Sequence, residues 1–479
     1  MIKTRFAPSP TGYLHVGGLR TALYNYLYAK KTGGTFVLRI EDTDQSRKVE
    51  GAVDNLLRTF NRIGIQFDEG PDQGGENGPY FQSQRLNIYM KYINELIDSG
   101  NAYPCFCDTE RLKNIRQQRL ADKLNTPYDR HCLSLSRDEA LTRMGTESHI
   151  IRLKSPADED IIFYDIVRDQ VSIKSNDLDD QVILKTDGFP TYHLANVVDD
   201  HLMGITHVIR GEEWLSSTPK HVLLYRFLGW SLPKFAHLPL LLNPDKSKLS
   251  KRQGDVAVED FLDKGFLAET MLNFVALLGW NPGNDKEIFS LKNLEKDFSI
   301  KRIQKSGAVF DQDKLNWMNS LYLKNESLED ICKNVKSVFA SENFDISNND
   351  KFKSAVDYAR KRVNTLKELP DEVRMFYFEL KFSNDDQEML SLKTSYSVLQ
   401  FWLKELDRQN SWNADDLKSL LKRTTEETGV KGKDLYSPLR LALYGSVHGP
   451  DMPTLFNLLD LETIKLRLKT SLEFHTGLS

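Results

Sequence analysis

The chain has 479 residues, of which 40% are hydrophobic and 28% charged, a composition typical of a globular protein with two to four domains. Its longest apolar stretches fall well short of the ~20 residues that cross a bilayer, no apolar leader follows Met1, and four cysteines are too few for a disulfide scaffold. We therefore expect a cytoplasmic protein without membrane contact. The net charge of −4 does not indicate a nucleic-acid partner, but a local basic face is enough to bind one.

The first forty residues predict a strand, a helix and a second strand. Ile2–Ala7 is the first strand, and a Pro/Gly-rich turn follows it. From His15 onward the apolar residues recur at helical spacing until Gly33, and Phe36–Ile40 is the next strand. This order is typical of a parallel βαβ unit.

Farther along the chain, strands are predicted at Gln181–Leu184 and Thr206–Arg210. A helix should follow, with Ser217 as its N-cap and Pro219 in its first turn. Residues 101–189 have the character of an insertion, and from about residue 325 the pattern is almost wholly helical. We expect a nucleotide-binding α/β half followed by a helical half.

The segment APSPTGYLHVGG joins the first strand to its helix. A helix N-terminus presents unpaired N–H groups and a positive dipole end, so this is where an α/β protein binds phosphate. His15 could donate to a phosphate oxygen, while Gly17 and Gly18 leave room for a nucleotide against the backbone. A tight turn with a surface histidine is the alternative explanation of this segment taken alone.

A second segment, Asp245–Gly254 (DKSKLSKRQG), is short, polar and rich in lysine. Most such runs are solvated loops. The functional alternative is a clamp in which Lys248 and Lys251 neutralise a triphosphate as charge builds at the α-phosphorus.

Together, HVGG after the first strand and KLSKR about 230 residues later resemble the two signature motifs of class I aminoacyl-tRNA synthetases. The blocks TRFAPSPTGYLHVGG, FVLRIEDTD, TDGFPTYHLANVVDDH and HVIRGEEW are similar to those of bacterial glutamyl-tRNA synthetases. Weaker similarity continues through FDQDKLNWM, RVNTLKEL and PLRLALYGS, so the resemblance covers nearly the whole chain.

This resemblance implies a fold and its division into domains. A Rossmann-like catalytic domain is expected over residues 1–100 and 190–255, with an inserted tRNA acceptor-binding subdomain over 101–189. Residues 256–324 would contact the tRNA stem, and 325–479 would form an all-α anticodon-binding domain.

Two arginines at strand ends, Arg5 and Arg210, suit the carboxylates of glutamate, because arginine binds a carboxylate through two parallel hydrogen bonds. Glu41, just after the second strand, suits the ammonium group. By resemblance, the glutamate-binding residues are Arg5, Ala7, Ser9, Glu41, Tyr192, Asn196 and Arg210. The resemblance likewise assigns ATP to His15, Gly17, Gly18, Glu213, Trp214, Leu241, Lys248, Leu249, Ser250 and Lys251.

The family reaction has two steps and needs ATP with Mg²⁺. The α-carboxylate of glutamate attacks the α-phosphorus of ATP to give glutamyl-adenylate and diphosphate, and a ribose hydroxyl of tRNA(Glu) then displaces AMP. Catalysis would rest on alignment and on stabilisation of phosphate charge, with His15, Lys248 and Lys251 as the catalytic residues. The resemblance also implies that tRNA binds before the amino acid is activated, and we expect a monomer.

Cys105, Cys107 and Cys132 lie in the insertion, and a structural zinc ion needs four such ligands. Many bacterial relatives place a histidine where this chain has Ser134. Tyr128, or alternatively His131, would supply the fourth ligand. Three buried cysteines without metal are the alternative interpretation, and Cys332 is expected in the core.

By resemblance, three arginines contact tRNA: Arg47 near the acceptor end, and Arg362 and Arg440 at the anticodon. Arginine stacks on a splayed base and bonds its edge, as recognition of a single-stranded loop requires. In having an arginine at position 362, the chain resembles enzymes that are restricted to tRNA(Glu).

Three alternatives to a strict glutamate–tRNA ligase remain. A non-discriminating ligase would also charge tRNA(Gln). A relative that attaches glutamate to queuosine would lack the helical half, and an RNA-binding paralogue without catalysis would have decayed HVGG or KLSKR motifs.

Overall fold

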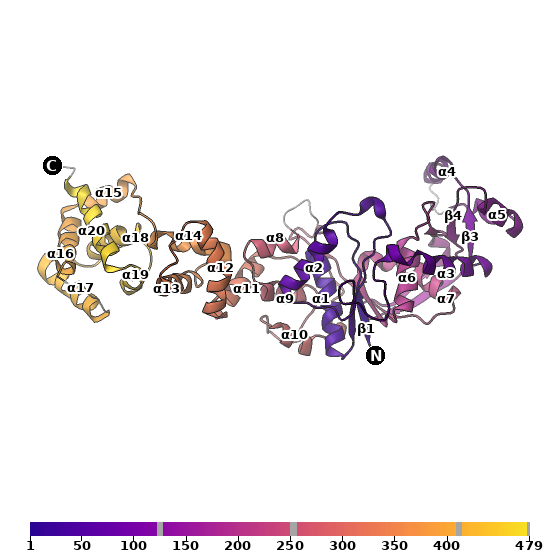
Figure 1. The fold of residues 1–479 in the computed structure, drawn as a ribbon, viewed down its shortest axis with the longest axis horizontal. Coiled ribbons are helices and arrows are strands. Elements are labelled where there is room, and N and C mark those ends of the chain that lie inside the picture. The colour runs from indigo at the N-terminus through magenta and orange to yellow at the C-terminus, as the bar shows by residue number, and fades with distance from the viewer. Residues whose placement is uncertain (122–127, 250–255, 409–413, 477–479) are drawn as a thin grey trace. The chain divides into compact units, whose positions relative to one another are not determined.

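A computed structural model describes residues 1–121, 128–249, 256–408 and 414–476 (Figure 1). The chain divides into two compact units, Met1–Met318 and Asn319–Ser479. The first unit is mixed α/β and the second is helical, as the sequence predicts. No helix within the described ranges is long and apolar enough to span a membrane.

The predicted βαβ unit is confirmed. Strand β1 (Lys3–Phe6) pairs in parallel with β2 (Thr35–Leu38), and helix α1 (Val16–Lys31) connects them. Gly33 ends the helix with a φ of 62°, which favours glycine. A side chain at Gly34 would collide with the Ile2 carbonyl, so the tight return to β2 requires glycine there.

A four-stranded sheet of order β6-β5-β9-β8 forms another part of the first unit and pairs strands from residues 101–189 with later ones. It contains β5 (Asp160–Asp165), β6 (Asp169–Lys174), β8 (His207–Gly211) and β9 (Lys234–Leu238). Strands β8 and β9 are parallel, and the Thr206 N–H donates to the Lys3 carbonyl at the start of β1. The carboxyl ends of β1 and β8 therefore open on the same side.

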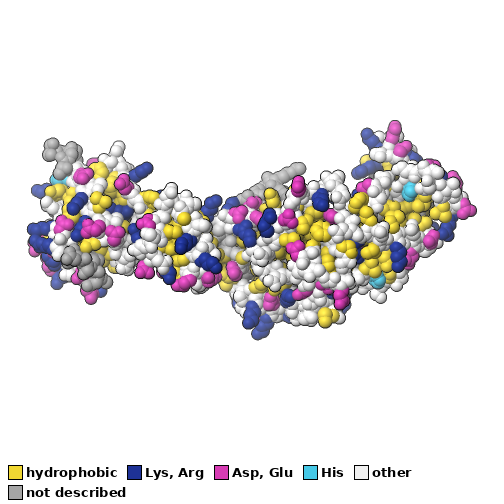
Figure 2. Space-filling view, in the orientation of Figure 1, with side chains coloured by type: hydrophobic (Ala, Val, Ile, Leu, Met, Phe, Trp, Pro, Cys, Tyr) yellow, Lys and Arg dark blue, Asp and Glu magenta, His cyan; other side chains and the backbone are white. Residues whose placement is uncertain are grey.

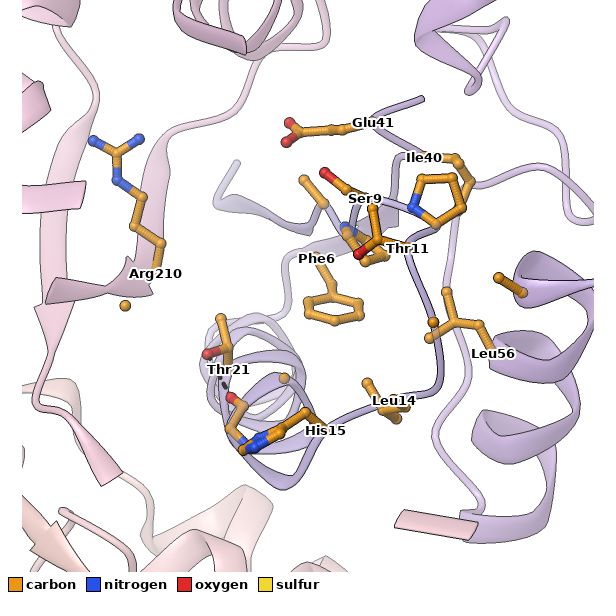
Figure 3. Close-up of a pocket in the computed structure, with 18 of the residues that line it drawn as sticks. Phe6, Ser9, Thr11, Leu14, His15, Thr21, Ile40, Glu41, Leu56 and Arg210 are labelled. Carbon is orange, nitrogen blue, oxygen red and sulfur yellow. Dashed lines mark hydrogen bonds between the residues drawn. The ribbon is translucent and has the colours of Figure 1, made fainter. Parts of the chain in front are cut away.

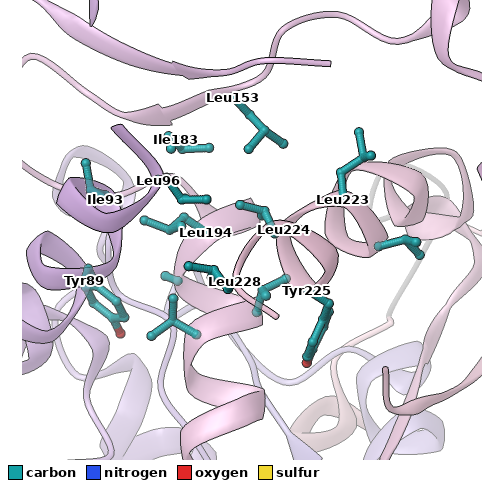
Figure 4. Packing of buried hydrophobic residues seen from close by; sticks show 14 of the residues in the cluster. Tyr89, Ile93, Leu96, Leu153, Ile183, Leu194, Leu223, Leu224, Tyr225 and Leu228 are labelled. Carbon is teal, nitrogen blue, oxygen red and sulfur yellow. The ribbon is translucent and has the colours of Figure 1, made fainter. Parts of the chain in front are cut away.

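Three helices pack a large apolar core against these strands: α3 (Leu86–Asp98), α6 (Tyr192–Leu202) and α7 (Thr218–Phe227). Figure 4 shows Leu96, Leu194 and Leu224 meeting in this core. Ser217 occupies the predicted N-cap position of α7, but its side chain makes no capping hydrogen bond. The reason is that the short 3-10 helix η5 (Glu212–Ser217) runs directly into α7.

Within the insertion, β3 (Ala102–Cys105), β4 (Ile150–Leu153) and β7 (Val182–Leu184) form an antiparallel sheet. Helices α4 (Thr109–Ala121) and α5 (Arg137–Met144) gather beside it at one end of the first unit (Figure 1). The remaining helices of this unit are α2 (Ala52–Ile63), α8 (Val258–Asp263), α9 (Ala268–Leu277) and α10 (Leu291–Asp297). A two-stranded sheet pairs β10 (Leu241–Leu242) with β11 (Ala308–Val309), and α11 (Gln312–Asn325) contains the division between the units.

The second unit is built from helices alone in its described part. They are α12 (Leu328–Ser341), α13 (Asn349–Ala359), α14 (Leu369–Val373), α15 (Asn384–Ser391), α16 (Lys393–Leu406), α17 (Ala414–Thr428), α18 (Lys433–Tyr444), α19 (Met452–Leu458) and α20 (Leu461–Thr476). Trp402 is fully buried, and its indole N–H donates to Thr424 Oγ1. Cys332 is buried in α12, as expected of a core cysteine.

Candidate active site

A pocket of about 470 Å³ opens at the carboxyl ends of β1 and β8. This volume is within the range of small-molecule sites. Figure 3 shows Arg210 on one side, Glu41 and Ser9 on another, and His15 at the start of α1. The residues expected to surround glutamate all line it: Arg5, Ala7, Ser9, Glu41, Tyr192, Asn196 and Arg210.

The start of α1 forms another wall. His15 is its N-cap, and the imidazole Nδ1 accepts the Gly17 N–H at 2.9 Å. A neutral His15 therefore carries its proton on Nε2. A Cβ at Gly17 would lie 3.3 Å from His15 Nδ1, and one at Gly18 would lie 3.1 Å from Leu14 Cδ1; both glycines line the pocket.

The Arg210 guanidinium is buried and held by neutral acceptors. Its Nε donates to His237 Nε2 at 3.1 Å, and Nη1 donates to the Tyr192 hydroxyl at 3.1 Å. Its Nη2 donates to Thr218 Oγ1 at 2.9 Å and to His221 Nδ1 at 3.1 Å. Within the described ranges, no carboxylate lies within ion-pair distance of Arg210.

The Tyr192 hydroxyl oxygen accepts hydrogen bonds from Arg210 and from Asn196 Nδ2. Because both are donors, the hydroxyl hydrogen remains available to a ligand that accepts. The Tyr192 ring packs against Trp214, with 4.0 Å between the ring centroids, so the phenol is fixed at the pocket wall.

Arg5 differs from Arg210 because it faces a carboxylate. Its Nε and Nη2 donate to Asp200 at 3.0 and 3.2 Å. Asp200 also accepts from Arg39 Nη1 at 2.7 Å. Burial alone would raise the pKa of Asp200, but the two arginines lower it below its ordinary value. Arg5 is therefore fixed in place by a protein anion.

Glu41 is buried beside Arg39. Its Oε1 accepts from Arg39 Nη2 at 3.0 Å and from Asn196 Nδ2 at 3.3 Å, whereas Oε2 has no hydrogen-bond partner within the described ranges. Burial raises the pKa of Glu41, opposed by Arg39 and Arg5. A cationic ligand group at Oε2 would favour the ionised carboxylate.

Asp199 precedes Asp200 on α6 and makes a separate set of hydrogen bonds. It accepts from Arg85 Nε at 2.7 Å, from Gln82 Nε2 at 2.8 Å and from the Tyr89 hydroxyl at 2.7 Å. Two consecutive carboxylates therefore connect α6 to β1, to the end of β2 and to the start of α3.

Two of the remaining ATP candidates belong to the pocket wall. Glu213 and Trp214 line the pocket. Leu241 is buried, and its carbonyl accepts the Leu249 N–H at 2.9 Å. Lys248 is exposed and forms a β-bridge with Leu242. Ser250 and Lys251, also predicted to contact ATP, lie outside the described residues.

The cysteines of the insertion come together around Tyr128. The Tyr128 hydroxyl lies 3.3 Å from Cys105 Sγ and 3.2 Å from Cys107 Sγ, and the sulfurs of Cys107 and Cys132 are 3.6 Å apart. This is the one cluster of three or more His, Cys, Asp or Glu ligands in the described part of the chain. The imidazole of His131 is exposed and is not part of it.

The electrostatic surroundings of the cysteines are uneven. Burial opposes ionisation of Cys105, but hydrogen bonds with Tyr128 and Arg152 outweigh it and lower the pKa of its thiol. Burial raises the pKa of Cys107 to about 11. Of these two thiols, Cys105 therefore ionises before Cys107.

The three expected tRNA contacts lie on the two units. Arg47 is exposed, pairs with Asp44 at 2.6 Å and lines the mouth of the pocket. In the second unit, the Arg362 guanidinium lies 3.7 Å from the centre of the Tyr358 ring. Arg362 and Arg440 both lower the pKa of Asp451, after its hydrogen bonds with Thr454, so the structure brings these two arginines around one carboxylate.

Several residues of the site were not predicted from the sequence: Asp165, Asp199, Asp200, His221 and His237. A signal for the two aspartates is that they directly follow the apolar pair Val197 and Val198 in a helix, where an unpaired buried carboxylate would be costly. His237 is likewise the lone polar residue between apolar neighbours in β9.

Comparison with known proteins now adds independent evidence. The family "tRNA synthetases class I (E and Q), catalytic domain" matches residues 1–317, and "Anticodon binding domain" matches residues 324–472. A protein named glutamate–tRNA ligase from Clostridioides difficile is 46% identical, over 98% of both chains. Another of that name from Alkaliphilus metalliredigens is 44% identical over 98% of both.

The chain belongs to the glutamate–tRNA ligase family of class I synthetases. A crystal structure of a glutamate tRNA ligase from Elizabethkingia meningosepticum, in complex with its amino acid, has a TM-score of 0.92 and 37% identity. It covers 98% of this chain and 99% of its own. This family membership confirms the predicted class I fold with its helical anticodon-binding half.

Proposed function

We propose that the protein ligates L-glutamate to tRNA(Glu) with ATP, through a glutamyl-adenylate, releasing diphosphate and AMP. The observation that carries the choice of glutamate is the state of the arginines in the pocket. Arg5 pairs with Asp200 and Arg47 with Asp44, whereas Arg210 has no carboxylate partner within the described ranges. A buried cation without an anion favours a ligand that brings a carboxylate.

The pocket supports one orientation of the amino acid. The side-chain carboxylate would accept from Arg210 and from the Tyr192 hydroxyl, and the ammonium group would donate to Glu41 Oε2. Glutamine offers Arg210 no negative charge, so the buried guanidinium would remain uncompensated, and a site built in this way rejects such an analogue strongly.

The chain's own residues would then align the reacting groups. An α-carboxylate oxygen of glutamate bonds to the α-phosphorus of ATP, and the bond to diphosphate breaks. The N-terminus of α1 and His15 would hold phosphate oxygens, with Lys248 and Lys251 opposite. In the second step a terminal ribose hydroxyl attacks the activated carbonyl, loses its proton and expels AMP.

The family uses ATP together with Mg²⁺. Mg²⁺ bound with a nucleotide commonly needs only one or two protein carboxylates besides the phosphates. Mg²⁺ would arrive with the triphosphate and neutralise part of its charge. Because ATP and tRNA are both cytoplasmic substrates, we place the reaction there, carried out by a monomer.

Aminoacylation of purified tRNA tests the proposal. Charging of tRNA(Glu) with glutamate, and diphosphate exchange with glutamate but not glutamine, are the expected results. Exchange should require tRNA, as the family resemblance implies. Equal charging of tRNA(Gln) would indicate the non-discriminating form. Binding of tRNA without any diphosphate exchange would instead favour an RNA-binding paralogue that lacks catalysis.

We also propose that Cys105, Cys107, Cys132 and Tyr128 hold one structural zinc ion. Three sulfurs within 4.8 Å of one another are ligands that zinc prefers, and the phenol oxygen beside them would complete a set of four. Protein purified without chelator should contain about one equivalent of zinc, and Tyr128→Phe should bind it more weakly. Zinc below a tenth of an equivalent in the parent protein would contradict the proposal.

A further inference from the structure

The side chains behind Arg210 form a chain of hydrogen bonds that leads away from the pocket. His237 on β9 and His221 on α7 both form hydrogen bonds with the guanidinium. His237 is also hydrogen-bonded to Asp165, and His221 to His193. None of these residues lines the pocket. They therefore act on a ligand through other side chains, chiefly Arg210, although His193 and His221 also pack against the Tyr192 ring.

The proton position of His237 follows from the hydrogen bonds that its two ring nitrogens make with Arg210 and Asp165. Arginine has donors only, so His237 Nε2 must accept from Arg210 Nε. The proton of a neutral ring is then on Nδ1, which donates to Asp165 at 2.6 Å. Asp165 is itself fixed by the N–H groups of Val167 and Arg168, at 2.9 Å each.

The proton position of His221 follows in the same way, but its two ring nitrogens exchange roles. Its Nδ1 accepts from Arg210 Nη2, so its proton is on Nε2 and is donated to His193 Nδ1 at 3.0 Å. Burial keeps the pKa of His237 at about 4 and lowers the pKa of His221 well below its ordinary value. Both rings are neutral acceptors at physiological pH.

We propose that Asp165, His237 and His221 are positioning residues that orient Arg210 for the glutamate side chain without neutralising it. This inference rests on the proposed function and deepens it. A carboxylate in direct contact with Arg210 would hold it equally well but would cancel the charge that selects an anionic substrate. An imidazole between Asp165 and Arg210 transmits the orientation and leaves the positive charge facing the pocket.

The two histidines use different ring nitrogens, and this makes a sharp test possible. The amide oxygen of glutamine can reach the position of Nε2, and that of asparagine the position of Nδ1. His237→Gln therefore keeps an acceptor for Arg210, while His237→Asn loses it. At position 221 the order is reversed, because the contact with Arg210 is made by Nδ1.

At position 237, we expect His237→Asn to raise the KM for glutamate at least tenfold more than His237→Gln does. At position 221, we expect His221→Gln to raise it at least tenfold more than His221→Asn does. The KM for ATP should change little in all four variants. Asp165→Asn should have the same effect as His237→Asn. If the amide oxygen of the new side chain still accepts from the Val167 and Arg168 N–H groups, its amide NH₂ group faces His237 Nδ1. The imidazole proton is then forced onto Nε2. His201→Gln, a substitution on α6 outside the pocket, is the matched control.

The measurement is tRNA-dependent diphosphate exchange with glutamate and ATP varied in turn. Exchange by the parent protein with glutamate is established first, and its absence would count against the proposed function itself. With that activity present, the same order of effects at both positions, or equal changes in the KM for glutamate and for ATP, would overturn the positioning role. Thermal unfolding of each variant distinguishes loss of structure from loss of orientation.

Discussion

Buried arginines of the first unit are held in two different ways. Arg5, Arg39 and Arg85 contact the carboxylates of Asp199 or Asp200, so their charges are compensated by the protein. Arg210 contacts only neutral side chains. Arginines that look alike in the sequence are therefore held differently, and we assign Arg210, the one of these four without a carboxylate partner, to a ligand.

Replacing Arg210 by alanine should raise the KM for glutamate by about 30-fold or more, because losing one partner of a buried charged pair costs about 2–5 kcal/mol. The KM for ATP should change little, since Arg210 lies on the amino-acid side of the pocket. Diphosphate exchange with each substrate varied measures both constants. Arg226→Ala, on an exposed arginine paired with Glu159, is the control. Equal effects of Arg210→Ala on both substrates would contradict the assignment.

Acidification should destabilise the protein through its buried histidines. Burial, with Lys220 and Arg210 nearby, lowers the pKa of His193 to about 4, and burial also lowers that of His237 to about 4. Between pH 6.5 and 4 the unfolded chain therefore binds protons that the folded chain does not, and stability falls as the pH falls. Each histidine contributes up to about 3 kcal/mol.

Urea unfolding at pH 7 and at pH 4.5 measures this loss. A His193→Asn variant, which cannot titrate there, should lose less stability on acidification than the parent protein. An identical loss in the two proteins would show that other groups control acid unfolding.

At the scale of elements, α1 illustrates how one side chain serves both structure and chemistry. His15 caps the helix through Nδ1. Asparagine is a good N-cap and alanine a poor one, so His15→Asn should unfold near the parent midpoint, while His15→Ala should be less stable by about 1 kcal/mol. Both should slow diphosphate exchange, because neither replaces the Nε2–H. Full activity of His15→Asn would limit His15 to capping.

The elements were largely predictable where sequence pattern and backbone preference agree. The βαβ unit, the strands ending at Leu184 and near Arg210, and the helical half all follow from apolar spacing and from Gly and Pro positions. The partners of buried charges were not predictable. Arg5 meets Asp200 from 195 residues away, and Arg210 meets His237 on another strand, so only the folded chain brings these pairs together.

The candidate site was predictable to the same extent. Its wall residues came from motifs, because each motif is local, and the pocket contains those assigned to glutamate. The supporting histidines and aspartates belong to no motif. Tyr128 as the phenol among the cysteines depended on resemblance, since nothing in its spacing distinguishes it from a core tyrosine.

For the whole molecule, we predict that recognition of the anticodon and chemistry on glutamate separate between the two units. Figure 2 shows acidic and basic side chains interspersed on the visible face of both, so specificity depends on particular contacts rather than on net charge. Arg362 is partly exposed and stacked on Tyr358, a geometry suited to an unpaired base.

Arg362→Gln should therefore reduce the preference for tRNA(Glu) over tRNA(Gln) by about tenfold, equivalent to ~1–3 kcal/mol for one base contact. The rate of diphosphate exchange at saturating tRNA should not change. Charging of both tRNAs by the variant gives the ratio. Lys361→Gln, on an adjacent lysine paired with Asp357, is the matched control, and an unchanged ratio in Arg362→Gln would remove Arg362 from anticodon reading.

The pair Asp199–Asp200 also has a consequence for the order in which the chain folds. These carboxylates hold Arg5, Arg39 and Arg85, which precede them by 114 to 195 residues. A ribosome releases the N-terminal motif long before it releases α6, so the nascent chain carries three arginines whose counter-ions have not yet been made. The pocket at the carboxyl ends of β1 and β8 is thus completed late in synthesis, only after α6 has left the ribosome.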